Sequence, residues 1–114
     1  KTAAGKGRIV PIHPKILPFV QAWAQHGHKY LITADGKKLS KQKYYECWAE
    51  VMDRIGADKT PHEARHTFET SLDNAKANRK CIDLLMGHKS KDVGNRVYNH
   101  KTLEQLRETI LLLE

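Results

Sequence analysis

The sequence predicts a mainly α-helical fold with a small β element, in the α+β class. Apolar residues recur at helical spacing along five stretches, and helix start and stop signals flank most of these stretches. Only Arg8–Ile12 and Tyr30–Thr33 have the short pattern that is typical of strands. The length of 114 residues allows one small domain with a modest core, and we expect a single domain over residues 1–114.

The first stretch of the chain predicts a strand followed by a helix. Lys1–Gly7 is polar and contains two glycines, which favours a turn or a flexible lead. Arg8–Ile12 is predicted as a short strand, and Pro11 confines it to a sheet edge or a strand end. A helix is predicted over residues 13–25, with Pro18 in its first turn, where backbone donors are unpaired anyway. Its apolar face consists of Ile16, Phe19, Val20 and Trp23.

The second helix is predicted from a Ser40 cap to about Ile55, after a turn at Asp35–Gly36. Gly56 supplies the stop signal. Residues that share one helical face are predicted to be buried, and they are Tyr44, Trp48, Val51, Met52 and Ile55.

A central helix is predicted from Thr60 to about Asn78. Thr60 and Glu63 have the spacing of a capping box, and Pro61 suits the first helical position. One apolar stripe follows the cap, formed by Ala64, Phe68, Leu72 and Ala75.

Two further helices complete the prediction. Arg79–Met86 is a short helix that Gly87 ends, with Ile82, Leu85 and Met86 facing inward. The last helix starts at a capping box of Thr102 and Gln105. Its apolar stripe needs a groove, either the domain's own or that of a neighbouring protomer. The stripe consists of Leu103, Leu106, Ile110 and Leu113, widened by Leu111 and Leu112.

Composition favours a polyanionic partner. Lys and Arg number 20 against 13 Asp and Glu, a net charge of +7, and nucleic acid is the usual partner of such a chain. Cys47 and Cys81 form no disulfide framework, so we expect reduced core cysteines in a cytoplasmic protein. No apolar run is long enough to span a membrane, and no membrane partner is expected. Because the chain starts at Lys1 without Met, we expect a piece of a longer protein.

The central helix carries the strongest candidate site. His62 and Arg65 are three residues apart near the helix N-terminus, so an imidazole and a guanidinium project together toward an anion such as phosphate. His62–His66 also matches the H-E-x-x-H zinc motif, but the extended motif would need Gly at Glu69 and His at Leu72. We therefore expect no metal and no cofactor, and keep a zinc hydrolase as the weaker alternative.

Three elements in order decide the assignment. His-x-x-Arg-His-Thr-Phe at residues 62–68 is followed by Leu-Met-Gly-His at residues 85–88, and Tyr98 follows ten residues later. In this order and spacing the chain resembles the tyrosine recombinase (phage integrase) family from Lys1 to about His100. The resemblance implies the C-terminal part of an integrase catalytic domain, truncated at its N-terminal side.

The resemblance also implies a role for each catalytic candidate in site-specific DNA recombination. Tyr98 would attack the phosphodiester and form a 3′-phosphotyrosine intermediate. Arg65 and His88 would bind the phosphate. His62 would act as a general base or would form a hydrogen bond with the phosphate. Lys1, which matches the lysine of the family's hairpin turn, would protonate the leaving oxygen.

The expected partner is double-stranded DNA, bound mainly through its phosphates. The candidate contacts are Lys37, Lys38, Lys41, Lys43 and Lys89. Lys41 and Lys43 lie in a first helical turn, where cations oppose the helix dipole and a phosphate would compensate them. In the family the full-length protein acts as a homo-oligomer, a tetramer on DNA, and the terminal segment 103–114 often packs onto an adjacent protomer.

One departure from the family pattern limits what the chain is expected to do alone. The family's other arginine lies upstream of the hairpin, and Arg8 does not match its place. We therefore expect this chain alone to be nearly inactive and the full protein to be active. The alternatives are a non-catalytic DNA-binding module, in which Tyr98 only packs, and a type IB topoisomerase, which shares the chemistry.

Overall fold

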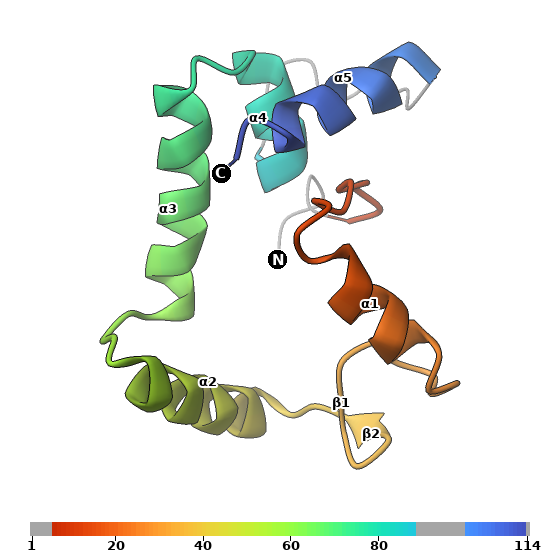
Figure 1. Cartoon of the computed structure of the whole chain (residues 1–114), viewed down its shortest axis with the longest axis vertical. Helices are drawn as coiled ribbons and strands as arrows, with labels where there is room; N and C mark the ends of the chain where they lie inside the picture. Colours follow the sequence, from red (N-terminus) through yellow and green to blue (C-terminus); the bar gives the residue numbers. More distant parts are fainter. Residues whose placement is uncertain (1–5, 89–99, 114) are drawn as a thin grey trace. The chain divides into compact units, whose positions relative to one another are not determined.

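The computed structural model of the chain describes residues 6–88 and 100–113 (Figure 1). Over these residues it has the predicted class, mainly α with one small β hairpin, and the fold-class prediction is confirmed. The elements are α1 (Leu17–Ala24), β1 (Thr33–Ala34), β2 (Lys37–Lys38), α2 (Lys41–Ile55), α3 (Pro61–Asn74), α4 (Arg79–Met86) and α5 (His100–Ile110). No helix in the described part of the chain is long and apolar enough to cross a membrane.

The chain divides into two compact units. The first, here called the core unit, consists of Lys1–His13 and His66–Glu114, and the second, the hairpin unit, consists of Pro14–Arg65. The boundary falls within α3, so this helix contributes residues to both units. The expectation of a single domain over residues 1–114 stays a prediction.

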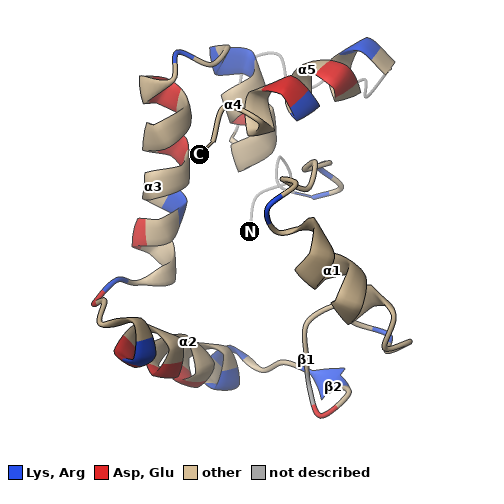
Figure 2. Cartoon of the chain, in the orientation of Figure 1, with Lys and Arg blue, Asp and Glu red and all other residues tan. Residues whose placement is uncertain are grey.

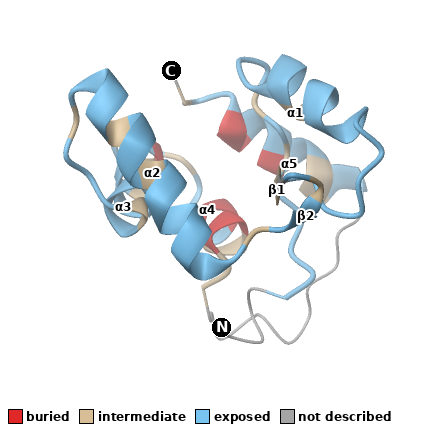
Figure 3. Cartoon of the chain, turned by 90° about the horizontal axis from the view of Figure 1, so that it is seen from below, coloured by how far each residue is buried: buried red, intermediate tan, exposed pale blue. Residues whose placement is uncertain are grey.

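The core unit is built on the apolar faces of α3, α4 and α5. Leu72, Ile82 and Leu106 are fully buried, one from each helix. Around them lie the other buried residues Cys81, Leu85, Met86 and Ile110. Figure 1 shows α4 beside α5, and Figure 3 shows buried positions on both helices in red. The inward face predicted for residues 79–86 is confirmed, and so is the burial of Cys81.

Local hydrogen bonds set the helix ends where the sequence predicts them. At the start of α3, Thr60 N–H donates to Glu63 Oε2 at 2.7 Å, and Glu63 N–H donates to Thr60 Oγ1 at 3.1 Å. Ser40 Oγ accepts from Lys43 N–H at the start of α2. Gly56 ends α2 and Gly87 ends α4, both in the left-handed conformation that suits glycine. These capping predictions are confirmed.

The central helix is shorter than predicted, ending at Asn74 rather than near Asn78. Lys76 adopts a positive φ of 58°, and Ala77 N–H donates to Leu72 O at 3.0 Å, which closes the helix without a glycine. Asn78 caps α4 instead, since its side chain accepts from Lys80 N–H. An asparagine favours a cap over a helix interior because its side chain competes for backbone donors.

Three other predicted boundaries also change. α1 begins at Leu17 rather than His13, with Pro18 in its first turn as expected, and α5 begins at His100, before the predicted cap at Thr102. The predicted strand Arg8–Ile12 is wrong, because the β1–β2 hairpin is the only sheet among the described residues and offers this segment no ladder. Instead, Arg8 Nη1 donates to Met86 O at 3.2 Å.

The β element of the fold is the hairpin β1–β2. Thr33 pairs with Lys38 and Ala34 with Lys37, around the turn predicted at Asp35–Gly36. The hairpin overlaps the second of the two stretches with strand patterns, Tyr30–Thr33, only at Thr33. Residues 30–32 form a bend rather than a strand, so that prediction is largely wrong.

The hairpin unit differs from the core unit, because neither α1 nor α2 contains a buried residue. The buried face predicted for α2 is wrong, since Ile55 is 65% exposed. The apolar face of α1 is exposed as well, and Phe19 on it is 60% exposed. Cys47, predicted in the core, is exposed. Trp48 is half-buried, and its indole N–H donates to Lys59 O at 2.5 Å. Periodicity identified which residues share a helix face, but not whether another element covers that face.

The capping box at the start of α3 gives a stability prediction. Thr60→Ala removes the hydroxyl that accepts from Glu63 N–H, and we expect it to lower the free energy of unfolding by about 1 kcal/mol in urea denaturation. Thr70→Ala, at an exposed position inside the same helix, is the control and should change it by less than about 0.5 kcal/mol. Equal effects of the two substitutions would contradict the capping role.

Candidate active site

His62 and Arg65 lie in the first two turns of α3, both exposed and on neighbouring positions of the helix surface. Pro61 has no N–H, and the amides of Glu63 and Ala64 already donate to Thr60. This helix end therefore has few backbone donors to offer an anion. Recognition of a phosphate at this place would depend on the guanidinium and imidazole side chains.

Glu63 belongs to the helix cap. The backbone N–H of Thr60, then its hydroxyl, lower the pKa of the Glu63 carboxyl below its usual value, and Lys59 Nζ lies 3.8 Å away. The zinc-hydrolase alternative would need this carboxylate as the general base beside His62 and His66. Within residues 6–88 and 100–113, no group of three or more His, Cys, Asp or Glu side chains is arranged to hold a metal ion. The structure gives that alternative no support.

A second polar cluster lies in the core unit, where α3 meets α4. Arg79 Nη2 contacts Glu69 Oε1 at 2.7 Å and Asp83 Oδ1 at 3.1 Å. His88, directly after the Gly87 cap, places its Nδ1 at 3.4 Å from Asp83 Oδ1 and 3.9 Å from Glu69 Oε1. We call Glu69, Arg79, Asp83 and His88 the carboxylate cluster. His88 is thus held against two acidic side chains through one edge of its ring.

His88 was predicted from the sequence as a site residue, whereas its three partners were not. A signal was present in part, since Arg79 and Asp83 are four residues apart, the spacing of an ion pair on one helix face. Glu69 carried no comparable signal, because its contact with Arg79 depends on how α3 packs on α4.

The charges of the carboxylate cluster stabilise one another. The Arg79 guanidinium donates a hydrogen bond to Glu69 and lowers the pKa of that carboxyl, and the nearby His88 and His66 act in the same direction. In return, the Glu69 carboxylate raises the pKa of Arg79.

Comparison with known proteins identifies the family to which the chain belongs. The family model described as the phage integrase family matches residues 1–105. The chain belongs to the phage integrase family. It is 32% identical over 83 residues to the tyrosine recombinase XerD of Corynebacterium glutamicum, a match that covers 71% of this chain and 27% of that protein. It is also 30% identical over 110 residues to the tyrosine recombinase XerA of Thermococcus onnurineus, covering 90% of this chain and 39% of that protein.

A third relative extends the comparison to another recombinase. The tyrosine recombinase XerC of Proteus mirabilis is 29% identical over 116 residues, covering 90% of this chain and 37% of that protein. The chain therefore spans less than half the length of these recombinases. No solved structure matches the chain significantly. The resemblance to the phage integrase family inferred from the sequence is confirmed.

The other predicted site residues of this phage integrase family member fall in two groups. Lys1, Lys89 and Tyr98 lie outside the described residues. The other four predicted lysines lie in the hairpin unit, where Figure 2 shows β2 in blue, and all four are exposed: Lys37 and Lys38 on β2, and Lys41 and Lys43 in the first turn of α2. Lys43 Nζ lies 3.9 Å from Glu46, and Lys41 Nζ lies 6.0 Å from the centre of the Tyr45 ring. Their roles in DNA binding stay a prediction.

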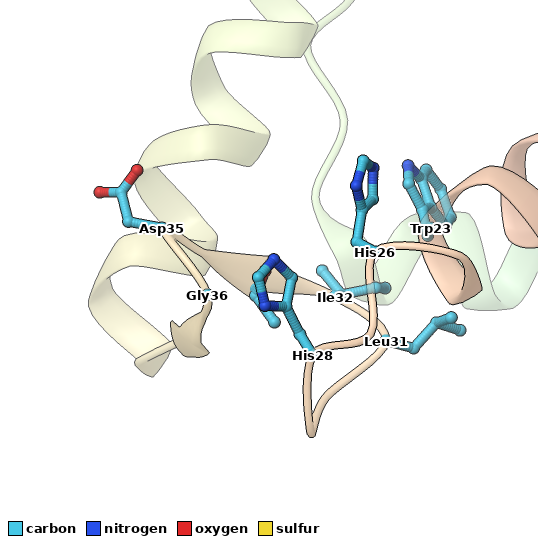
Figure 4. A pocket seen from close by; sticks show the side chains of 8 residues that line it. Trp23, His26, His28, Leu31, Ile32, Asp35 and Gly36 are labelled. Atoms are coloured by element: carbon cyan, nitrogen blue, oxygen red, sulfur yellow. The ribbon is translucent and has the colours of Figure 1, made fainter.

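An open hollow in the hairpin unit contains none of the predicted site residues (Figure 4). Its volume is about 410 Å³, and the rings of His26 and His28 stack in it with centres 6.1 Å apart. The remaining lining residues are Trp23, Leu31, Ile32, Thr33, Asp35 and Gly36.

The ion pair between Arg79 and Glu69 predicts how this acid titrates. We expect the Glu69 pKa, measured by carboxyl ¹³C NMR, to lie below that of an ordinary glutamate and to rise in Arg79→Gln. Because the pKa of Glu69 is lower in the folded state than in the unfolded state, its ion pair with Arg79 stabilises the fold at a pH above the unfolded-state pKa. This stabilisation is lost as the pH falls through the folded-state pKa.

Arg54→Gln is the matched control for this titration. It removes an exposed arginine that pairs with Glu50 on α2 and should leave the Glu69 pKa unchanged. An ordinary Glu69 pKa in the wild-type chain would contradict the ion pair in solution.

Proposed function

We propose that this chain supplies catalytic residues to a site-specific DNA recombinase that acts through a 3′-phosphotyrosine intermediate. The observation that carries the proposal is membership of the phage integrase family over residues 1–105, a range that includes every candidate catalytic residue. Exposure of His62 and Arg65 together on α3 supports it, because a DNA phosphate could reach both.

In the proposed reaction the Tyr98 hydroxyl attacks the scissile phosphate and the 5′-oxygen leaves. The covalent phosphotyrosine preserves the bond energy without ATP and divides one difficult step into two. A second 5′-hydroxyl then attacks the same phosphorus, and the tyrosine oxygen leaves. No metal ion and no cofactor takes part in this scheme.

Each of the other residues has a proposed role that suits its chemistry. The Arg65 guanidinium donates to the non-bridging oxygens, where negative charge grows in the transition state. His62 accepts the tyrosine proton or donates a hydrogen bond to the phosphate. His88 is the second histidine that donates a hydrogen bond to the phosphate. Lys1 protonates the leaving 5′-oxygen, which would otherwise depart as an unstable alkoxide.

We infer that the four predicted lysines of the hairpin unit contact the DNA backbone and position it rather than read its sequence. The first turn of α2 contains Lys41 and Lys43 and no acidic residue, so positive side chains are added to the positive end of the helix dipole. A phosphate would relieve this repulsion. Lys37, Lys38 and Lys89 are proposed as further phosphate contacts.

We also infer a homo-oligomer on DNA, a tetramer in the full-length protein. If residues 103–114 dock onto a neighbouring protomer, Leu111 and Leu112 are the best placed to do so, because Leu106 and Ile110 are already buried in the chain's own core. Leu111 is 59% exposed and Leu112 is 46% exposed, directly after the last residue of α5.

The covalent step can be tested with a suicide DNA substrate and the protein expressed with its natural flanking sequence. We expect Tyr98→Phe to abolish the covalent protein–DNA adduct while DNA binding is retained, and Tyr30→Phe, the matched control, to form the adduct normally. Arg65→Gln should slow adduct formation by about 100- to 1,000-fold, because it removes one donor to the transition state.

Two outcomes of this experiment would contradict the proposal. An adduct from Tyr98→Phe would assign the nucleophile elsewhere. Wild-type protein that binds DNA and forms no adduct would favour the non-catalytic DNA-binding module.

The lysine contacts predict a change in the salt dependence of DNA binding. Replacing Lys41 and Lys43 together by Gln should reduce the slope of log Kd against log salt by about 0.9 for each phosphate contact that is lost. Lys80→Gln, an exposed lysine in the first turn of α4, is the control. An unchanged slope in the double variant, measured by fluorescence anisotropy, would remove these lysines from the interface.

A further inference from the structure

His88 has a backbone that the end of α4 fixes firmly. Gly87 takes the left-handed conformation with φ of 70°, and Gly87 N–H donates to Leu84 O at 3.3 Å. His88 N–H donates to Asp83 O at 3.0 Å, which completes the helix-ending motif. The histidine therefore leaves the helix in one direction, and Asp83 contacts it through both its backbone and its side chain.

The imidazole ring is also oriented, by the carboxylate cluster. Its Nδ1 faces Asp83 Oδ1 at 3.4 Å and Glu69 Oε1 at 3.9 Å. The two acids are the less exposed members of the cluster, with side-chain exposures of 22% and 23%, against 37% for the histidine. Since Nδ1 and Nε2 lie on opposite edges of an imidazole, Nε2 points away from the carboxylates.

The charges in the cluster favour the same orientation. The single guanidinium of Arg79 balances only one of the two carboxylate charges. The other negative charge favours an N–H of His88 pointing toward the carboxylates. Arg79 contacts both acids and so fixes them in place. His66 and Asp73 add weaker charge effects on Glu69 and Arg79, respectively.

We propose that Glu69 and Asp83 are positioning residues that hold the Nδ1–H of His88 toward themselves and so present Nε2 to the scissile phosphate. This inference rests on the proposed recombinase function. A carboxylate that orients a histidine through one nitrogen sets which nitrogen does the chemistry at the other. The Nδ1 distances exceed those of strong hydrogen bonds, and such contacts often tighten only when the substrate is bound.

The first test uses the chain itself and needs no DNA. Long-range ¹H–¹⁵N NMR distinguishes the two neutral forms of His88, and we expect the Nδ1–H form in the wild type. Glu69→Gln combined with Asp83→Asn should shift the population toward the Nε2–H form. Both substitutions preserve side-chain size, and unchanged methyl signals of Leu72 and Leu106 would verify the fold. A wild-type histidine in the Nε2–H form would overturn the proposal.

The second test measures adduct formation on the suicide substrate, using the protein with its natural flanking sequence. We expect the double variant to form adduct about 10- to 100-fold more slowly at saturating DNA, with unchanged DNA affinity. In a His88→Ala background the same two substitutions should have no further effect, because they act through that histidine. Glu50→Gln breaks an exposed ion pair on α2 and is the control.

The outcomes separate this proposal from the proposed function. The expected tautomer with an unchanged rate in the double variant overturns the positioning role alone, and so does an equal loss of rate with and without His88. A wild-type protein that forms no adduct overturns the recombinase function and this assignment with it.

Discussion

Burial of Leu72, Ile82 and Leu106 in one cluster is the constraint on which the described part of the site depends. Each of these residues comes from a different helix, so the cluster holds α3, α4 and α5 together. Glu69 lies one turn before Leu72 on α3, and this packing brings it to Arg79 on α4. An ion pair between exposed arginine and glutamate contributes little by itself. Here it has a geometric consequence, because it adds a second carboxylate to the edge of His88.

The acidic residues near the phosphate-binding candidates are each engaged by a nearby group. Glu63 is adjacent to His62, yet its carboxylate accepts from Thr60 N–H in the helix cap. Glu69 is four residues after Arg65, and its carboxylate pairs with Arg79. Ionised acids beside an anion site would repel a phosphate. The hydrogen bond from Thr60 and the ion pair with Arg79 offset part of the negative charge of these two glutamates. Both glutamates can therefore remain in the helix near the candidate phosphate site.

The apolar faces of α1 and α2 show where inference from periodicity ends. Figure 2 shows that α1 carries no charged residue, and the large side chains Phe19 and Trp23 are nevertheless exposed. The pattern correctly placed apolar residues on shared helix faces. Burial also requires another element on the same face, and no local feature of the sequence specifies that element.

By itself, the sequence determined the features that depend on interactions between residues only a few positions apart. Ser40, the Thr60–Glu63 pair, Gly56 and Gly87 set helix ends through bonds to near neighbours, so each could be predicted from local spacing. The ordered motif around Arg65, His88 and Tyr98 likewise identified the family. Only the tertiary structure decided which apolar stripes are buried and which groups surround His88. Those outcomes depend on packing between helices that are separated along the chain, and single-segment patterns carry no information about such contacts.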